Sequence, residues 1–232
     1  MKKKLIKNKD TVAIILPNYN SYKFIENTVS SIIKQSYKKW ELFIVDDCSE
    51  KKTITILKNL KKNKKIKLIF LNKNKGAGYC RNLAIKKSRS DFLAFIDADD
   101  IWHKEKLTKQ INFMKINKYN FSYTHYTTFN DRNSFIKNIK TPYRFNFETF
   151  TKNTSIATST MIVRRSLSAD IKFSNSKICE DYYYKCQILK KIKYAYCFPK
   201  FLTKYQIRKN SLQSNKIRNL YWMWKINNNL NN

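Results

Sequence analysis

Short apolar runs alternate with helical segments over the first hundred residues, and this rhythm constrains the fold most. The runs are rich in Ile, Val, Leu and Phe, and each is short enough for a buried strand. They lie at Val12–Leu16, Leu42–Val45, Ile66–Leu71 and Phe92–Ile96, with helical patterns between them at Ser21–Gln35, Thr53–Lys62 and Asn82–Lys87. Strands and helices that alternate in this way predict right-handed βαβ units. We therefore expect an α/β fold with a mostly parallel central sheet and helices on both faces.

The second half of the chain predicts a smaller and less regular region. Helices are expected at Lys104–Asn117 and Glu180–Lys191, and strands at Phe121–Phe129, Ala157–Val163 and, once or twice, within Ala195–Gln206. Asn130–Lys152 is polar and aromatic, which predicts irregular structure. Because neither an internal repeat nor a linker interrupts the chain, we expect residues 1–232 to form one domain.

The charge is strongly positive. The chain has 48 Lys and Arg against 16 Asp and Glu, a formal net charge of +32. Such a chain is expected to contact anions: phosphates, nucleic acid or an acidic membrane face. Only 8 of the 48 cations are arginines, whereas a nucleic-acid reader would favour Arg. A selected basic surface and A/T-rich codon usage explain this composition equally well.

Cysteine usage and hydropathy bear on the compartment. The five cysteines are odd in number and contain no C-x-x-C pair, which predicts neither a zinc site nor a disulfide framework. No run approaches the roughly 20 apolar residues of a membrane span, and Val12–Leu16 ends at Pro17 like a strand rather than a signal peptide. We expect a cytoplasmic protein that can also bind peripherally to the inner face of the plasma membrane.

The tail at 216–232 is basic and aromatic. Its cations are Lys216, Arg218 and Lys225, and its rings are Tyr221, Trp222 and Trp224. Such a segment can lie at an anionic membrane interface. It can equally pack against the domain, and the sequence leaves both readings open.

The few carboxylates gather at the ends of predicted strands. Asp46 and Asp47 follow the second strand, and Asp97 and Asp99 follow the fourth. In an open parallel sheet, ligands bind beyond the carboxyl ends of the strands. Two carboxylates one residue apart can share Mg²⁺ or Mn²⁺, which would bridge to phosphate oxygens. The alternative is that these acids stabilise the N-terminus of the following helix.

A glycine-containing segment, Lys75–Asn82, follows the third strand. Gly76 and Gly78 allow the backbone to approach a ligand, and Arg81 could reach a phosphate or a base. A dinucleotide fingerprint would need glycine at position 81 and should follow the first strand, which disfavours a nicotinamide dehydrogenase. The alternative is a tight turn with an exposed arginine.

Taken together, these motifs resemble those of the family 2 glycosyltransferases that build bacterial cell-surface polysaccharide and lipopolysaccharide. In the family's order they are Ile14–Asn20 (P-x-Y-N), Ser36–Ser49 (V-D-D-x-S), Gly76–Asn82 (G-x-x-x-A-R-N, with Cys80 where alanine is usual), Phe95–Trp102 (D-x-D-D), Glu180–Asp181 (E-D) and Lys204–Ser211 (Y-R-x-x-x-x-S). The resemblance covers roughly residues 10–215. One departure is Gln206, which stands where the last element often has arginine; Arg208 is the expected substitute.

The resemblance implies the Rossmann-like GT-A fold and a role for each matching residue. It implies a nucleotide-sugar half at about 10–103, an acceptor and catalytic half at about 104–215, and a tail at 216–232. Substrate contacts fall to Pro17, Tyr19, Asn20, Asp47, Arg81, Asp97 and Arg208, metal ligation to Asp97 and Asp99, and general base catalysis to Asp181. Glu180, beside Asp181, is expected to raise one pKa of the pair toward working pH.

The implied activity is transfer of a hexose or N-acetylhexosamine from a nucleotide diphosphate sugar, expected to be a UDP-sugar. The acceptor would be a cell-surface glycan or lipid-linked oligosaccharide, and a single base opposite the leaving group would invert the anomeric carbon. One alternative is a nucleic-acid-binding module, which +32 motivates but which leaves the Asp clusters unexplained, so no nucleic-acid partner is expected. Another is a nucleotidyltransferase, which would carry a basic, Gly-rich loop where Pro17–Asn20 stands.

Overall fold

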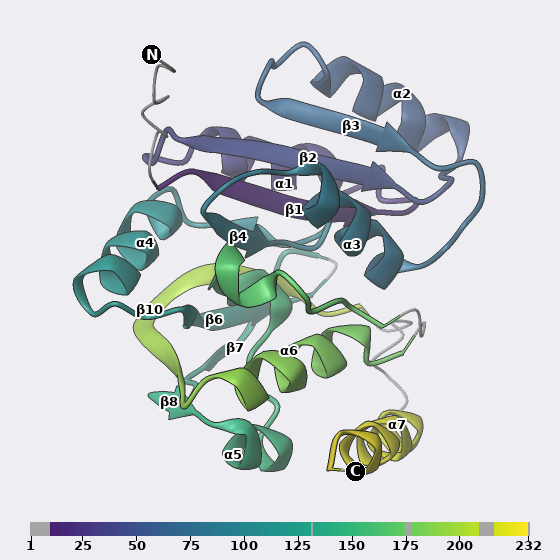
Figure 1. Cartoon of the computed structure of the whole chain (residues 1–232). Coiled ribbons are helices and arrows are strands. Elements are labelled where there is room, and N and C mark those ends of the chain that lie inside the picture. Colours follow the sequence, from purple (N-terminus) through teal and green to yellow (C-terminus); the bar gives the residue numbers. More distant parts are fainter. Residues whose placement is uncertain (1–9, 131, 175–177, 209–215, 232) are drawn as a thin grey trace, which may run out of the picture.

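The computed structural model describes residues 10–130, 132–174, 178–208 and 216–231 (Figure 1). Its strands are β1 (Val12–Asn18), β2 (Trp40–Asp46), β3 (Ile66–Phe70), β4 (Phe92–Phe95), β5 (Ile101–Trp102), β6 (Phe121–Phe129), β7 (Phe135–Ile139), β8 (Arg144–Phe145), β9 (Ile162–Arg164) and β10 (Ala195–Gln206). Its helices are α1 (Ile25–Ile33), α2 (Lys51–Leu60), α3 (Ala77–Lys87), α4 (Lys106–Ile116), α5 (Phe147–Lys152), α6 (Glu180–Lys191) and α7 (Lys216–Asn231), with 3₁₀ turns η1 (Thr158–Thr160) and η2 (Arg165–Ser168). All strands join one sheet of order β3-β2-β1-β4-β9-β6-β10-β5, with β7 beside β6 and β8 beside β10.

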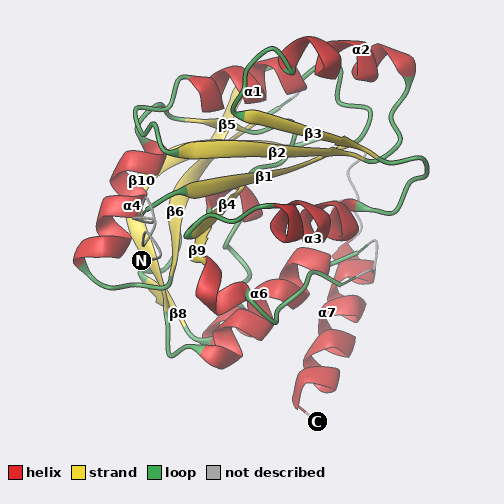
Figure 2. Cartoon of the chain, turned by 45° about the horizontal axis from the view of Figure 1, so that its top comes forward, coloured by secondary structure: helices red, strands yellow, loops and turns green. Residues whose placement is uncertain are grey.

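The first four strands of this order pair in parallel, as the apolar rhythm predicted. Side chains alternate across a strand, so β1 divides its apolar residues between two cores. Val12, Ile14 and Leu16 pack under α1, α2 and α4, whereas Ala13 and Ile15 face α3 and α6. Figure 2 shows α1 and α2 on one side of the sheet and α3 and α6 on the other. Burial on both faces explains why β1, β2 and β4 are almost wholly apolar.

The rest of the sheet is mixed. β9 lies antiparallel to both β4 and β6, while β6 and β10 run parallel and pair residues as distant as Ser122 and Tyr196. The prediction of an irregular Asn130–Lys152 was wrong, because β7, β8 and α5 lie there, paired with β6 and β10 or packed on α6. The expected strand Ala157–Val163 was wrong over 158–160, which form η1.

The helix after β3 differs from its expected boundary. α3 begins at Ala77 rather than Asn82, because the glycine loop turns directly into the helix: Gly76, at φ 88°, precedes its first residue. Gly78 lies against Ser174 and Glu180, where a side-chain carbon would meet the Ser174 carbonyl. The loop therefore packs tightly on the segment that leads to α6.

The tail forms α7, which packs on α6 and lies on the far side of the fold from α2 (Figures 1 and 2). Within the described ranges, no helix has both the length and the apolar character that a bilayer crossing requires.

Candidate active site

The two carboxylates at the end of β2, Asp46 and Asp47, each hydrogen-bond to a loop. Asp46 accepts hydrogen bonds from the backbone amide and the hydroxyl of Ser49, at 3.0 and 2.6 Å. Asp47 accepts from the backbone amides of Lys75 and Gly76, at 2.7 and 2.8 Å. Asp46 therefore stabilises the turn that leads to Ser49. Asp47 instead holds the glycine loop against the end of β2.

The turn after β1 presents one aromatic ring to solvent. Tyr19 is 54% exposed, although it lies between the buried strand and Ser21. Asn20 fixes the turn: its amide donates to the Ser49 hydroxyl at 2.9 Å, and its side-chain oxygen accepts from the Glu50 amide at 2.8 Å. Pro17 is half-buried within β1, opposite Val45 of β2. An exposed ring on a rigid turn is suited to stacking on a nucleobase.

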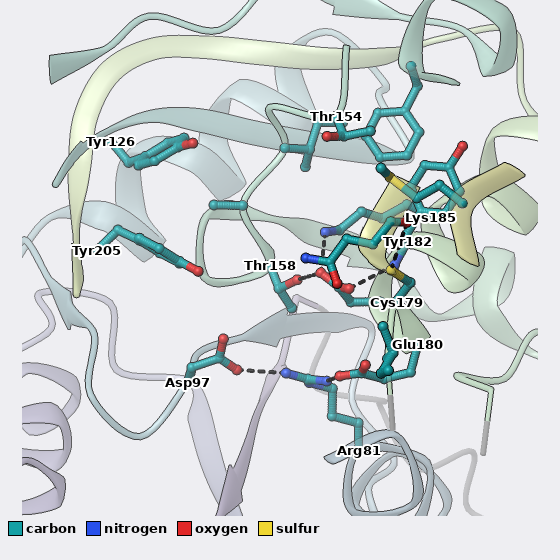
Figure 3. Close-up of a pocket in the computed structure, with 17 residues that line it drawn as sticks. Arg81, Asp97, Tyr126, Thr154, Thr158, Cys179, Glu180, Tyr182, Lys185 and Tyr205 are labelled. Atoms are coloured by element: carbon teal, nitrogen blue, oxygen red, sulfur yellow. Dashed lines mark hydrogen bonds and ion pairs between the residues drawn. The ribbon is translucent and has the colours of Figure 1, made fainter. Parts of the chain in front are cut away.

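Arg81 joins the two halves of the chain. From α3 it donates to Asp97 at 2.7 Å and to Glu180 at 2.8 Å, and its side chain is only 5% exposed (Figure 3). Burial works against its charge, but Asp97, Glu180 and Asp181 more than offset this and raise the pKa of Arg81. The alternative of an exposed arginine on a turn was wrong, because two carboxylates far apart in sequence draw this side chain inward.

The end of β10 lies over the acids that follow β4. Arg208 donates to Asp99 at 2.6 Å, and the backbone amide of Gln206 donates to Asp100 at 2.8 Å. Burial raises the pKa of Asp99 to about 6, against the opposing charge of Arg208 and with a further contribution from Asp97. Burial, together with Asp99 and Asp97, also raises the pKa of Asp100. Asp99, at 10% exposure, is thus a buried carboxylate whose charge a cation stabilises.

These acids fit a divalent ion only with help from a ligand. Among the residues that the structure describes, no three His, Cys, Asp or Glu side chains gather into a complete metal site. Mg²⁺ commonly takes one or two carboxylates and completes its shell with substrate phosphates and water. Asp99, which already meets the guanidinium of Arg208, and Asp97 together match that pattern.

The two acids that begin α6, Glu180 and Asp181, have pKa values shifted in opposite directions. Asp181 accepts from the Thr158 hydroxyl at 2.6 Å and from the Lys185 ammonium at 2.7 Å. Burial alone would raise the pKa of Asp181, but Lys185 and Thr158 outweigh it and lower this pKa. Burial raises the pKa of Glu180, against Arg81 and with Asp181 adding to the rise. Of the pair, Glu180 therefore has the raised pKa and Asp181 stays ionised.

The turn η1 connects the two acidic groups. Its Thr158 hydroxyl donates to Asp181, and its Ser159 hydroxyl accepts from the backbone amide of Asp97 at 2.9 Å. Lys106 and Gln110 of α4 both donate to the carbonyl of Thr160, at 3.1 and 3.0 Å.

Several of these residues were not found from the sequence. Thr158 and Ser159 lie in a segment that reads as a strand, so nothing marked them. Lys185 follows Asp181 by four residues on a helix, and that i,i+4 spacing was the available signal.

A pocket of about 390 Å³ opens among these side chains. Arg81, Asp97, Glu180 and Asp181 form its charged side (Figure 3). Tyr126 and Tyr205 line it from β6 and β10, with their rings 5.7 Å apart. A pocket of this size suits a small ligand, and aromatic faces beside carboxylates suit a polar ring such as a sugar.

The family assignment follows from a model that matches residues 13–171, described as glycosyl transferase family 2. The chain belongs to this family. It is a glycosyltransferase of α/β architecture, so the prediction of the family is confirmed and the nucleotidyltransferase alternative was wrong. The glycosyltransferase resembles enzymes of cell-surface polysaccharide synthesis over almost its whole length.

Two relatives illustrate this. The Bacillus subtilis glycosyltransferase TuaG, provisionally named for teichuronic acid biosynthesis, is 35% identical over 94% of this chain and 87% of its own. WfgD of Escherichia coli is 34% identical over 93% of this chain and 84% of its own. Its name makes it a beta-1,3-glucosyltransferase with UDP-Glc as donor and alpha-D-GlcNAc-diphosphoundecaprenol as acceptor.

Solved structures confirm the GT-A fold. Staphylococcus aureus TarS in complex with UDP-GlcNAc has a TM-score of 0.79 at 23% identity, covering 94% of this chain and 65% of that one. A mannosyltransferase from Pyrobaculum calidifontis, solved with GDP-Man and Mn²⁺, has a TM-score of 0.71 at 16% identity and covers 91% of this chain and 61% of that one.

Proposed function

We propose that this glycosyltransferase moves a sugar from a UDP-sugar to a hydroxyl of a lipid-linked or other cell-surface glycan, with inversion and with a divalent metal. The observation that carries the proposal is the pocket that Asp97 and Asp181 both line, with η1 in contact with both acids. The UDP-GlcNAc complex of TarS and the lipid-linked acceptor in the name of WfgD support the donor and acceptor classes.

On the donor side, the expected contacts follow the loops at the strand ends. Tyr19 stacks on the uracil from its exposed position, and Asp47, held beside the glycine loop, faces the nucleoside. Asp97 and Asp99 would hold the ion. When bound, Mg²⁺ or Mn²⁺ supplies positive charge to the diphosphate as it leaves. Arg208, half-exposed and paired with Asp99, is placed to turn its guanidinium to the diphosphate.

On the acceptor side, Asp181 takes the proton. The acceptor oxygen attacks the anomeric carbon as its O–H proton passes to the Asp181 carboxylate. The bond from that carbon to the diphosphate oxygen breaks, and its electron pair leaves with UDP. Asp181 is ionised before the reaction because its pKa is lowered. Thr158 and Lys185 hold it in one orientation, which matters because general bases act only from a fixed geometry.

The same proposal includes a place and partners. We infer a peripheral protein at the cytoplasmic face of the plasma membrane, where a lipid-linked acceptor presents its sugar. Residues 10–103 serve the nucleotide sugar and residues 104–215 the acceptor within a single domain.

The test is calorimetric titration with UDP, with and without Mn²⁺. Metal-dependent binding is expected for the wild type and should be lost in Asp99→Asn. Asp170→Asn is the matched control, because Asp170 is a carboxylate with 88% side-chain exposure. Duplex DNA at the same salt concentration is the control ligand. Binding of UDP that is indifferent to Mn²⁺ and to Asp99→Asn would remove the metal from the proposal; tight DNA binding without UDP binding would remove the donor.

A further inference from the structure

The helix α7 has two apolar faces. The inner one packs on α6 through Met223, Ile226 and Leu230, which join the core on the α3 and α6 side of the sheet. The hydroxyl of Tyr182 on α6 also donates to Asn227 at 2.7 Å. This inner face accounts for the attachment of the helix to the domain and leaves the other face unexplained.

The outer face is an exposed apolar stripe. Its residues are Ile217, Leu220, Tyr221 and Trp224, which are 83, 62, 55 and 61% exposed. The spacing of 0, 3, 4 and 7 places them on one side of a helix. Contiguous exposed apolar surface of this kind marks an interaction site in a folded protein. We call these four residues the outer stripe.

The charge around the outer stripe identifies what covers it. Asp181 is the last acidic residue of the chain, and the 51 residues after it contain nine lysines and two arginines. Lys225 is exposed beside the stripe, with its ammonium 5.3 Å from the centre of the Trp222 ring. A second copy of this chain, at +32, would bring like charge against this face. An anionic bilayer brings the opposite charge and an apolar layer that accepts Trp, Tyr and Leu.

We propose that the outer stripe of α7 docks on the surface of an anionic lipid bilayer. The inference rests on the proposed function, since it gives the lipid-linked acceptor its route to the pocket. Asn219 and Met223 line the pocket from the other side of the same helix. A bilayer on the stripe therefore lies about one helix diameter, roughly 10–12 Å, from the catalytic pocket. That spacing suits an acceptor whose lipid stays in the membrane while its sugar enters the pocket.

Vesicle sedimentation tests the proposal with the full chain. Vesicles of phosphatidylcholine, with or without phosphatidylglycerol, are incubated with the wild type and the triple variant Leu220→Ser/Tyr221→Ser/Trp224→Ser. The wild type should bind only the anionic vesicles, and the triple variant should lose on the order of tenfold or more in partition. Lys225→Gln alone should lose about fivefold.

A matched control separates this face from general surface stickiness. Ile116→Ser/Phe135→Ser/Tyr143→Ser removes three residues of 80, 65 and 58% exposure from other elements and should bind vesicles like the wild type. Tryptophan fluorescence gives a second readout. Trp40 and Trp102 are buried, so a blue shift on vesicles should come from α7 and shrink in Trp224→Phe. Circular dichroism melting confirms that each variant is folded.

Three results would overturn the proposal: no binding of the wild type to anionic vesicles, undiminished binding of the triple variant, or a concentration-dependent dimer that the triple variant abolishes. UDP titration of the same triple variant keeps the two proposals apart. It should match the wild type, because no outer-stripe residue lines the pocket as the structure describes it. A failure of UDP binding in the wild type would count against the proposed donor and leave the vesicle result standing.

Discussion

Asp99 and the pocket-lining Asp181 are neutralised in different ways. Asp99, on the donor side, meets Arg208, whose side chain is 50% exposed and comes from the end of β10. Asp181, on the acceptor side, meets Lys185, which is 4% exposed and lies one turn along the same helix. An exposed partner can be exchanged for an ion or a diphosphate at little cost. A buried partner one turn away stays, so the Asp99 pair can open to a ligand, whereas the Asp181 pair holds one carboxylate still.

Arg81 and η1 link the acids that follow β4 to the acids that begin α6. Arg81 bridges Asp97 to Glu180, and η1 contacts Asp97 through Ser159 and Asp181 through Thr158. The sugar must lie between the leaving group and the base, and misplacement by about 1 Å can cost a hundredfold in rate. Two independent bridges therefore serve geometry more than charge.

The largest expected effect comes from removing the base. Asp181→Asn keeps the shape and the Thr158 contact but cannot take a proton, so kcat should fall by about 10²–10⁴-fold. The affinity for UDP should be unchanged, because the change lies on the acceptor side. Transfer assays with UDP-glucose and UDP-GlcNAc, beside UDP titration, measure both.

Glu180→Gln is the matched variant for that comparison. It loses the ionic bond to Arg81 and should weaken donor binding and turnover together. If Asp181→Asn kept most of its activity while Glu180→Gln lost it, Glu180, with its raised pKa, would be the base and the assignment made here would be wrong.

The parallel half of the sheet could be predicted because its evidence is local. β1, β2 and β4 are buried almost throughout, so each reads as an apolar run, and the helices α1 and α2 each show an apolar face. The acids could be located because they lie in sequence at the ends of these strands. Pairs such as Asp47 with the Lys75 and Gly76 amides were beyond reach, because they depend on how one loop folds over another.

The second half was harder because its order comes from distant partners. β6 pairs with β10 across more than 70 residues, and η1 exists because Lys106 and Gln110 hold its last carbonyl. The hydrophobic pattern of residues 157–163 does not indicate these hydrogen bonds, because their donors lie in α4. The role predicted for Asp181 came from the resemblance alone, and its lowered pKa depends on contacts with Lys185 and Thr158 that the sequence does not reveal.

The next effect in size tests the support beneath η1. Lys106 is fully buried, and burial lowers its pKa to about 7. Lys106→Met should cost about 1–3 kcal/mol near pH 10, since the Gln110 oxygen, which accepts from the Lys106 nitrogen at 2.6 Å, loses its donor. Unfolding by urea at several pH values measures this.

The pH dependence of that difference has a definite sign. The folded pKa of Lys106 is below the unfolded value of 10.5, so the unfolded chain binds more protons between about pH 7 and 10.5. Stability from Lys106 is therefore present above pH 10.5, falls as the pH drops, and is lost by about pH 7. As the pH falls from 10.5 to about 7, the free energy of unfolding of the wild type should therefore decrease relative to that of Lys106→Met. A difference that stays constant with pH would show that Lys106 is not held as a neutral amine.

A smaller effect sharpens the contrast between exchangeable and fixed partners. The Lys185 ammonium lowers the pKa of Asp181, so Lys185→Met should raise this pKa. Because the base must be ionised, the acidic limb of kcat/KM should move to higher pH by the same amount. Arg208→Met is the donor-side counterpart and should weaken UDP binding instead. If the acidic limb of kcat/KM does not move in Lys185→Met, then that limb reports the titration of a group other than Asp181.

The smallest effect isolates the contribution of η1 to orientation. Thr158→Val removes one hydroxyl that donates to Asp181 and leaves the Lys185 ion pair in place. Losing that bond raises the basicity of Asp181, which alone would speed proton transfer, but it also frees the carboxylate to turn. Because orientation outweighs a modest gain in basicity, kcat should fall about tenfold with the KM for the donor unchanged. Thr154→Val, at a threonine that lines the same pocket, should change kcat little. A rise in kcat for Thr158→Val would mean that Lys185 alone orients Asp181, and that η1 acts on the donor side through Ser159 and Asp97.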